Sequence, residues 1–444
     1  MAIARLQGTR PPSPAATINL WIGRGIAPIA CPARPKTCQS LSLPFLSPTR
    51  IFSVAMFVTP TLSLYVPLAL APLLGLIAVL VAAGWALRRG SGVRLARVPA
   101  ALFAAMAVLA LASALWAYDP GETLDKLHRL VLAIAAGIIV ISAATGLDKD
   151  ARATCGRSLL FGMVLALLAL AVERAAGGVL VKTGLSPNDV NAFMNQFNRG
   201  LTVLSILIWP AIVVAARIRW LFGAAMFVAT LGLLFTFRTN AADLALCLGA
   251  AVFVLACAWP RIAGRALIVV VALSVLGAPF VEKTLPPPKE LFTELDVPRS
   301  AYHRLLMWDF TTNRVMERPV LGWGFNASRI MPGAEKHLDT FETALPLHPH
   351  NAALQWWLEL GVLGALLGAG LVACAANAVR TGSRGRMGQA GASATIVSAM
   401  TVAFLSYGIW QGWWMAALFL TAGYTAAIAG RPPSGAGAQP AGGT

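Results

Sequence analysis

The chain has 444 residues, of which 57% are apolar and only 12% charged, whereas about 25% of the residues in a soluble domain are charged. Its mean hydropathy is +0.71, and so few charges could not cover the surface of a water-soluble protein of this size. Long apolar runs recur along the whole chain, as in polytopic α-helical membrane proteins. Rossmann enzymes, β-sandwiches and disulfide-stapled secreted modules are excluded together.

The formal net charge is +17, but its distribution argues against a nucleic-acid partner. The Lys and Arg residues sit in short connectors between apolar runs, for example Arg88, Arg89, Arg94 and Arg97. This pattern is typical of loops held on the cytoplasmic side of a membrane. The six cysteines show no zinc-site spacing. The sequence therefore predicts no metal site and no cofactor.

The N-terminal arm, residues 1–50, is rich in Pro and Arg. Arg24 and Pro28 interrupt the only stretch that resembles a secretory signal. We expect this arm to be disordered. An alternative is that translation naturally starts at Met56 and that the assigned start lies too far upstream. A second disordered tail is predicted at residues 431–444.

Twelve apolar runs are long enough to cross a bilayer, which takes roughly 17–25 residues. The predicted fold is thus all-α and polytopic, with about twelve transmembrane helices, nine within residues 51–281 and three within 350–430. The spans are 52–68, 69–87, 98–116, 128–147, 155–173, 200–217, 220–237, 241–259, 264–281, 351–373, 392–410 and 412–429.

The basic connectors alternate with connectors that carry little positive charge. The basic set comprises residues 88–97, 149–157, 217–219, 261–265 and 380–386. If this set is cytoplasmic, both termini are cytoplasmic too. That parity requires residues 52–87 to cross twice, as two short helices hinged near Pro67 and Pro72.

Residues 282–349 form a large loop on the predicted non-cytoplasmic side, and it carries nine of the chain's 18 acidic residues. Apolar residues from Tyr302 to Met316 recur with a period close to 3.6, which predicts an amphipathic helix at the outer membrane boundary. Pro319 ends the pattern, and Gly322-Trp323-Gly324 follows as a turn. A lid over a site between helices would have this form.

The segment 348–364 holds the strongest candidate for catalysis. Pro349 suits the start of a helix, which would put His350 in the first helical turn. There the positive end of the helix dipole would lower the imidazole pKa. A neutral histidine can accept a proton, so His350 is the predicted general base. Free backbone N–H groups at the same helix end suit an anion such as pyrophosphate.

Below His350, the side chains of Asn351, Gln355 and Glu359 recur every four residues along one helix face. They are interpreted most simply as a hydrogen-bond network between helices, with substrate binding by Asn351 and Gln355 as the functional alternative. His348 is expected to bind or position substrate. Gly361, Gly364 and Gly368 are expected to pack against a neighbouring helix.

This segment resembles the O-antigen ligase family of bacterial inner-membrane proteins. That family carries a His-Asn pair, nine residues and then Gly-x-x-Gly, which here are His350-Asn351 and Gly361-Val362-Leu363-Gly364. The preceding Arg304-x-x-x-Trp308 and Pro319-Val320-Leu321-Gly322-Trp323-Gly324 also resemble the family. In layout the resemblance covers residues 60–429.

The resemblance implies a glycosyltransferase of the inner membrane, with its active site facing the periplasm. The donor would be a glycan on undecaprenyl pyrophosphate, the acceptor lipid A–core oligosaccharide, and the transfer metal-independent and inverting. Without a metal, arginines must stabilise the leaving pyrophosphate. Arg304 has an essential counterpart in the family, and Arg238 aligns with a family arginine, although Phe237 stands where the family usually has Ser. Arg199 is a third candidate.

Other activities stay open on the sequence alone. A polysaccharide polymerase or a protein O-oligosaccharyltransferase would use the same donor, and the motif does not separate them from a ligase. A twelve-span transporter is a further alternative. Transporters commonly have two related halves and a midplane site, whereas this sequence has no half-to-half similarity and its polar residues collect at the predicted outer end.

Overall fold

The structure is a computed structural model that describes residues 46–87, 97–177, 187–237, 239–295, 298–338 and 343–431. For residues 187–193, 195 and 196 only the backbone is described. Most of the predicted N-terminal arm, nearly all of the C-terminal tail and Arg238 lie outside these ranges.

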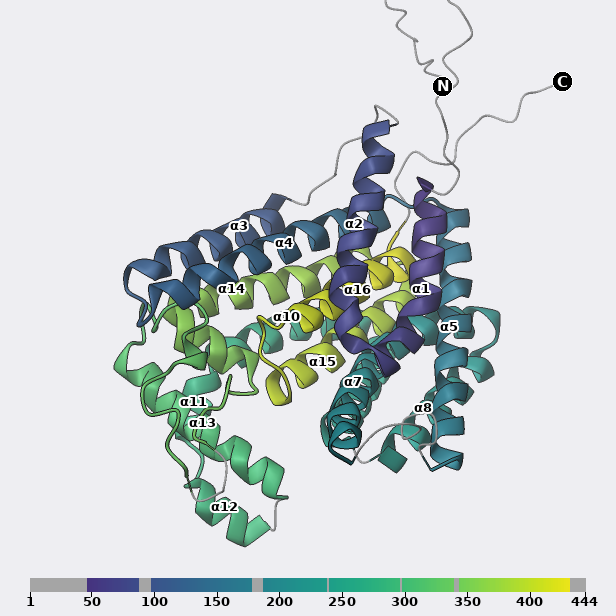
Figure 1. Ribbon diagram of the computed structural model, residues 1–444. Coiled ribbons are helices and arrows are strands. Elements are labelled where there is room, and N and C mark those ends of the chain that lie inside the picture. Colours follow the sequence, from purple (N-terminus) through teal and green to yellow (C-terminus); the bar gives the residue numbers. More distant parts are fainter. Residues whose placement is uncertain are drawn as a thin grey trace, which may run out of the picture. The chain divides into compact units, whose positions relative to one another are not determined.

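The described residues form fifteen α-helices, three short 3-10 turns and no strand beyond two isolated bridges (Figure 1). The α-helices are α1 (Pro48–Tyr65), α2 (Leu70–Leu87), α3 (Arg97–Ala112), α4 (Pro120–Thr145), α5 (Lys149–Ala175), α7 (Pro187–Ile218), α8 (Trp220–Phe237), α9 (Asn240–Ala258), α10 (Pro260–Leu276), α11 (Ala278–Lys283), α12 (Pro288–Leu295), α13 (Arg299–Glu317), α14 (Ala352–Gly382), α15 (Gly385–Leu405) and α16 (Gly412–Ala429). The 3-10 turns are η2 (Pro67–Ala69), η3 (Ser113–Leu115) and η4 (Ala327–Arg329).

Each of the twelve predicted spans coincides with one of these helices. Within the described part of the chain, ten helices are long and apolar enough to cross a membrane. The other two predicted spans correspond to α1, of 18 residues, and α10, of 17 residues. The predicted helix within the large loop is present as α13. The all-α, polytopic membrane fold is thereby confirmed.

The predicted hinge between the first two spans is present. Helix α1 ends at Tyr65, Val66 leaves the helical region at φ −138° and ψ 62°, and Pro67 opens η2. Helix α2 then packs against α1. At its other end α1 begins at Pro48, inside the arm expected to be disordered, because the Ser47 side chain accepts a hydrogen bond from the N–H of Arg50.

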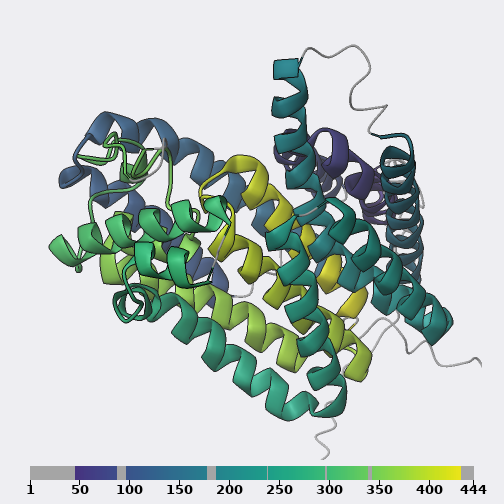
Figure 2. The same ribbon diagram turned by 90° about the horizontal axis from the view of Figure 1, so that it is seen from below.

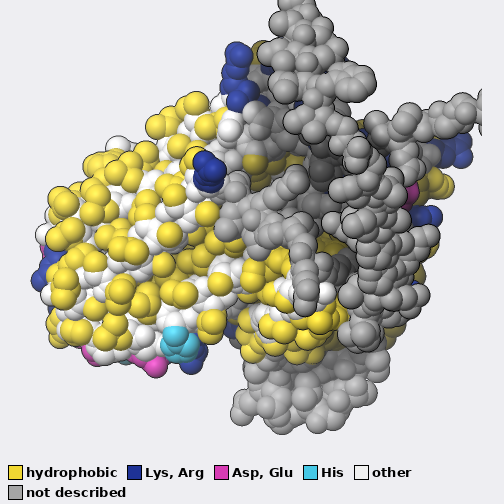
Figure 3. All heavy atoms as spheres, turned by 90° about the horizontal axis from the view of Figure 1, so that it is seen from above, with side chains coloured by type: hydrophobic (Ala, Val, Ile, Leu, Met, Phe, Trp, Pro, Cys, Tyr) yellow, Lys and Arg dark blue, Asp and Glu magenta, His cyan; other side chains and the backbone are white. Residues whose placement is uncertain are grey.

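The outer helices expose apolar side chains that a soluble protein would bury. Val79 on α2, Val108 on α3 and Leu132 on α4 are 66%, 65% and 65% exposed. Figure 3 shows hydrophobic side chains over most of the described surface seen from above, with few charges among them. An apolar surface of this extent fits contact with lipid.

The core of the bundle lies around α7 and α16. About four-fifths of the residues in the apolar windows of these two helices are buried, 83% and 78%. Trp209 of α7 stacks on Phe253 at 5.8 Å and donates a hydrogen bond to Ser398 of α15. Seen from below, the yellow C-terminal helices lie between the green segment that includes α13 and the teal helices α7 and α8 (Figure 2).

One end of α16 is surrounded by arginines. Arg152 donates hydrogen bonds to the carbonyls of Ala426, Ala427 and Gly430, and Arg217 donates to Ile428. These arginines satisfy carbonyls that the end of a helix leaves without partners. They come from the basic connectors 149–157 and 217–219, so these connectors meet at this end of the bundle.

Helix α14 is interrupted at Gly361, whose φ of 63° and ψ of −158° are not helical. The freed carbonyls of Leu358 and Glu359 accept hydrogen bonds from the N–H groups of Trp323 and Gly324, at 2.9 and 2.8 Å. The turn predicted at Gly322-Trp323-Gly324 therefore docks into the helix. The expectation that Gly361 packs against a neighbouring helix was wrong, because its partner is this loop.

We predict that Gly361→Ala destabilises the protein. A Cβ at this position would lie 2.2 Å from the carbonyl oxygen of Val320, and the positive φ is unfavourable for alanine. The expected loss is about 2 kcal/mol or more, measured as a lower melting temperature in detergent. Gly75→Ala is the control, because a Cβ at Gly75 has no neighbour within 4 Å. Equal melting temperatures for the two variants would contradict this role of Gly361.

Candidate active site

The predicted catalytic histidine lies where three segments meet. These are the loop that leads into α14, the start of α14, and the connector between α15 and α16, residues 406–411, called here the α15–α16 connector. Trp308 of α13 also reaches this point, because its indole N–H donates to the carbonyl of Pro349 at 2.9 Å. The amphipathic helix of the large loop is thus tied to the residue just before His350.

His350 stands immediately before the helix rather than in its first turn. Asn351 is the N-cap, and its side-chain oxygen accepts hydrogen bonds from the N–H groups of Ala353 and Leu354 at 3.0 and 3.2 Å. His350 has a φ of 53°, in the left-handed region. Such a backbone costs a non-glycine residue about 1–3 kcal/mol and is concentrated at functional sites. The prediction that the helix starts at Pro349 was wrong, because α14 begins at Ala352.

A backbone carbonyl orients the His350 ring. Nδ1 lies 2.5 Å from the carbonyl oxygen of Ser406. A carbonyl only accepts, so Nδ1 carries the proton in the neutral ring and Nε2 is the basic nitrogen. This is the arrangement that a general base acting through Nε2 requires.

His348 is buried beside His350, with 4.3 Å between the ring centroids. Its Nδ1 accepts from the backbone N–H of His350 at 3.2 Å, and its Nε2 lies 2.8 Å from the side-chain nitrogen of Gln411. Burial is the largest cause that lowers the pKa of His348 to about 3; the protonated form of His350 and the charges of Arg329 and Arg199 lower it further. His348 is therefore neutral at physiological pH and acts as a hydrogen-bonding group.

Two of the three predicted arginines lie within electrostatic range of the same side chain, Tyr407. Arg199 of α7 lies over the ring of Trp413, at 5.6 Å from its centroid. Burial raises the pKa of Tyr407 in the α15–α16 connector, while the charges of Arg199 and Arg304 oppose that rise. Both guanidinium groups are thus close enough to act on one side chain next to the histidines. Arg238 lies outside the described residues.

Gln355 and Glu359 belong to a buried network. The carboxylate of Glu359, which is fully buried, accepts hydrogen bonds from the backbone N–H of Asn326, the hydroxyl of Ser328, the amide of Gln355 and the indole of Trp410, at 2.6 to 2.9 Å. The amide oxygen of Gln355 accepts from the N–H of Ile409 at 2.9 Å. A buried carboxylate needs such partners.

Sequence reasoning missed two parts of the site. The first is the α15–α16 connector, which supplies the acceptor for His350 and partners for His348, Gln355 and Glu359. The second is Arg329, an exposed residue whose charge acts on His348. The connector's interruption of two apolar runs by Tyr407, Trp410 and Gln411 was a usable signal, whereas nothing in the sequence set Arg329 apart.

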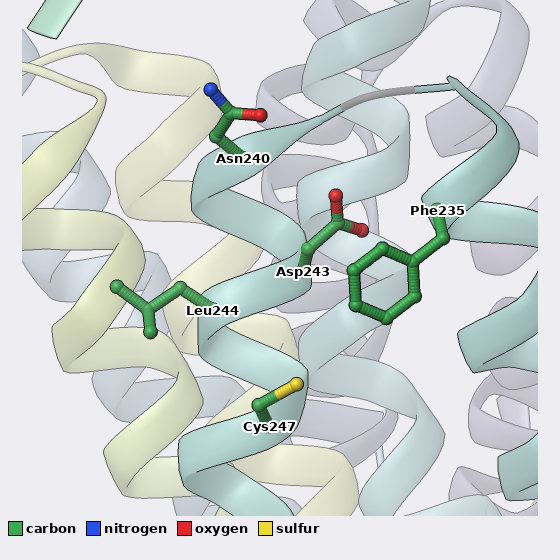
Figure 4. A pocket seen from close by; sticks show the side chains of 5 residues that line it. All are labelled: Phe235, Asn240, Asp243, Leu244 and Cys247. Atoms are coloured by element: carbon green, nitrogen blue, oxygen red, sulfur yellow. The ribbon is translucent and has the colours of Figure 1, made fainter. Parts of the chain in front are cut away.

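Two cavities lie near the predicted residues. One of about 280 Å³ borders the site and is lined by Asn351, Trp308, Glu282 and several apolar side chains. The other, of about 440 Å³, lies on α8 and α9, where the carboxylate of Asp243 is beside the ring of Phe235 (Figure 4). Each cavity is lined by one acidic residue, Glu282 in the first and Asp243 in the second. The first cavity is the better candidate for substrate, because Asn351, the neighbour of His350, lines it.

Fold and site together define an α-helical membrane protein with a polar site of histidine and arginine at one end of its helix bundle. Residues 224–368 match the sequence model described as O-Antigen ligase. The predicted resemblance to the O-antigen ligase family is thereby confirmed. The matched segment includes Arg304, His350 and both glycines of the Gly-x-x-Gly motif.

Relatives with curated names agree with this match. A Rickettsia conorii protein named "Putative polysaccharide ligase" is 27% identical over 264 residues, covering 58% of this chain and 63% of that protein. A Rickettsia prowazekii protein of similar name is 28% identical, with 58% and 64% covered. One from Rickettsia bellii is 28% identical, with 69% and 74% covered. The chain thus spans just under two thirds of the first two relatives.

We predict that the protein loses stability as the pH falls. The unfolded chain binds a proton at His348 near pH 6.5, whereas the folded chain does so only near pH 3. Between these values the unfolded state holds more protons, so the free energy of unfolding falls as the pH is lowered. In detergent, the melting temperature should drop from pH 7.5 to pH 4.5, and drop less in His348→Gln. His128→Gln, at an exposed position of α4, should retain the full drop, and an unchanged drop in His348→Gln would count against burial of a neutral ring.

Proposed function

We propose that this protein is a glycosyltransferase that moves a glycan from undecaprenyl pyrophosphate to lipid A–core oligosaccharide. The observation that carries the proposal is the fixed ring of His350, whose Nδ1 is bonded to Ser406. The positive charges of Arg199 and Arg304 act on Tyr407, the residue after Ser406. A proton acceptor together with arginines, which are always positively charged and bind anions, suits the displacement of pyrophosphate by a sugar hydroxyl.

In the proposed reaction, Nε2 of His350 takes the proton of an acceptor hydroxyl while the oxygen attacks the anomeric carbon of the donor glycan. The bond between that carbon and the pyrophosphate oxygen breaks, and its electron pair leaves with the pyrophosphate. Arg304 and Arg199, with Arg238 as a third candidate, would stabilise the charge that develops there. A single displacement inverts the anomeric configuration.

The charge distribution supports a periplasmic site in the inner membrane. Arg152 and Arg217 surround the carboxyl end of α16, and the histidine site lies at the opposite end of that helix. The 18 residues of α16 correspond to about 27 Å at 1.5 Å per residue, close to the thickness of the hydrocarbon core. Basic connectors favour the cytoplasm, so the site belongs on the other side.

The cavity of about 280 Å³ supports a lipid-linked donor. Leu273, Val281, Leu285 and Phe404 give it apolar walls, and Asn351 lies at its edge. Isoprene units could occupy the apolar part while the pyrophosphate stays with the arginines. Asn351 has its oxygen committed to the helix cap, so its amide nitrogen is the group that would bind substrate.

The names of the relatives favour a ligase over a polymerase, because they describe polysaccharide ligases. The two reactions give different products from purified components. A ligase attaches the glycan to lipid A–core, whereas a polymerase lengthens the lipid-linked glycan. Mass spectrometry of the products after incubation with both lipids therefore separates them.

We predict that His350→Ala abolishes glycan transfer without loss of folded protein. The assay combines purified protein, polyprenyl-pyrophosphate-linked glycan and lipid A–core in the presence of a chelator, and the wild-type protein should remain active there. General base catalysis contributes about 10²–10⁴-fold in rate, so a residual rate below one hundredth of wild type is expected. His128→Ala should transfer at the wild-type rate. A wild-type rate in His350→Ala would remove the catalytic role of this histidine.

We further predict that Arg304→Ala lowers kcat by about 10²-fold or more, as expected when a group that stabilises developing negative charge is removed. Arg304→Lys should recover part of the rate, because it keeps the charge but not the bidentate geometry. Arg299→Ala is the matched control, since Arg299 is an exposed arginine in the first turn of the same helix. Equal rates for the two alanine variants would exclude a specific role for Arg304.

A further inference from the structure

We propose that the α15–α16 connector is the positioning element of the active site. Its Ser406 carbonyl fixes which nitrogen of His350 is basic, and its Gly408 leaves room for the ring of His348 to pack against the connector. The inference rests on the proposed function, because it assumes that His350 is the catalytic base. The evidence is a set of contacts between the connector and the segment 348–359.

Four of the six connector residues bond to this segment. The carbonyl of Ser406 accepts from Nδ1 of His350, the N–H of Ile409 donates to Gln355, the indole of Trp410 donates to Glu359, and the side chain of Gln411 contacts His348. Three of the contacts hold α14 and the loop before it. The fourth, from Ser406, sets the protonation pattern of the His350 ring.

The connector is itself anchored on the core of the bundle. The Tyr407 hydroxyl lies 3.2 Å from the hydroxyl of Thr202 in α7, and its ring packs edge-on against Trp413 at 4.7 Å. Thr202 is three residues from Arg199. The connector therefore holds the histidines and the arginine of α7 in one frame, which makes the Ser406 carbonyl a fixed rather than an adjustable partner.

Gly408 occupies the closest approach between the connector and the histidines. A Cβ at this position would lie 2.9 Å from both Cγ and Cδ2 of His348 and 3.2 Å from the amide oxygen of Gln355. His348 in turn accepts from the backbone N–H of His350. A methyl group at position 408 would thus displace His348 and, through it, the strained backbone of His350.

The first test compares glycine-to-alanine variants in the connector, at Gly408, and at the first residue of α16, Gly412. We expect Gly408→Ala to lower kcat at least tenfold with little change in KM for the lipid-linked donor, because it misplaces the base but spares the donor's ligands. Gly412→Ala is the control, since a Cβ at Gly412 meets nothing within 4 Å. In the His348→Ala background the new methyl has room, so Gly408→Ala should cost little further rate. If Gly408→Ala lowered kcat by the same factor in the His348→Ala background, the claim that position 408 acts through His348 would be overturned.

The second test does not depend on activity. The chain has only five histidines, so ¹⁵N-histidine labelling of the detergent-solubilised protein gives a simple spectrum, with His350 assigned from the His350→Gln variant. At pH 7.5 we expect a protonated Nδ1 and an unprotonated Nε2 in the wild type, and a mixture of tautomers in Gly408→Ala. Protonation on Nε2 in the wild type would overturn the inference. A fixed Nδ1–H tautomer in a protein that transfers no glycan would instead overturn the proposed function alone.

Discussion

The buried carboxyl group of Glu359 joins three segments of the chain close to the histidine site. Its two oxygens accept from the turn after α13, through Asn326 and Ser328, from α14 itself, through Gln355, and from the α15–α16 connector, through Trp410. An acceptor of this strength in an apolar bundle needs all of its donors. Any arrangement that separated these segments would leave buried polar groups without partners, so Glu359 favours the arrangement that assembles the site.

The interruption of α14 also holds segments of the site together, through backbone hydrogen bonds rather than through a side chain. At Gly361 the helix gives up its own hydrogen bonds, and the backbone of residues 319–324 takes them over. Gly322 has to be small for the same reason, because a Cβ there would lie 2.5 Å from the carbonyl carbon of Glu359. The two glycine motifs in the sequence are thus two halves of one backbone joint, and His350 lies about three helical turns from it.

The sequence was sufficient to predict the helices. Apolar runs of the right length predict helices directly, and all twelve predicted spans are helical. The details of the site were not predictable in the same way, because they depend on contacts between residues far apart in the chain. Ser406 lies 56 positions from His350, and Trp410 lies 51 positions from Glu359. No local period encodes such a pair, and the left-handed backbone of His350 follows from the contacts rather than from its neighbours.

The partner of His350 belongs to the main chain, and this has a consequence for how the protein tolerates change. Every amino acid provides a carbonyl oxygen, so a replacement at position 406 leaves the orienting atom in place as long as the chain follows the same path. Enzymes that orient a histidine with an aspartate can lose that group through one codon change. Here the corresponding atom is lost only when the course of the polypeptide between two helices is altered, by an insertion, a deletion or a bulkier neighbour.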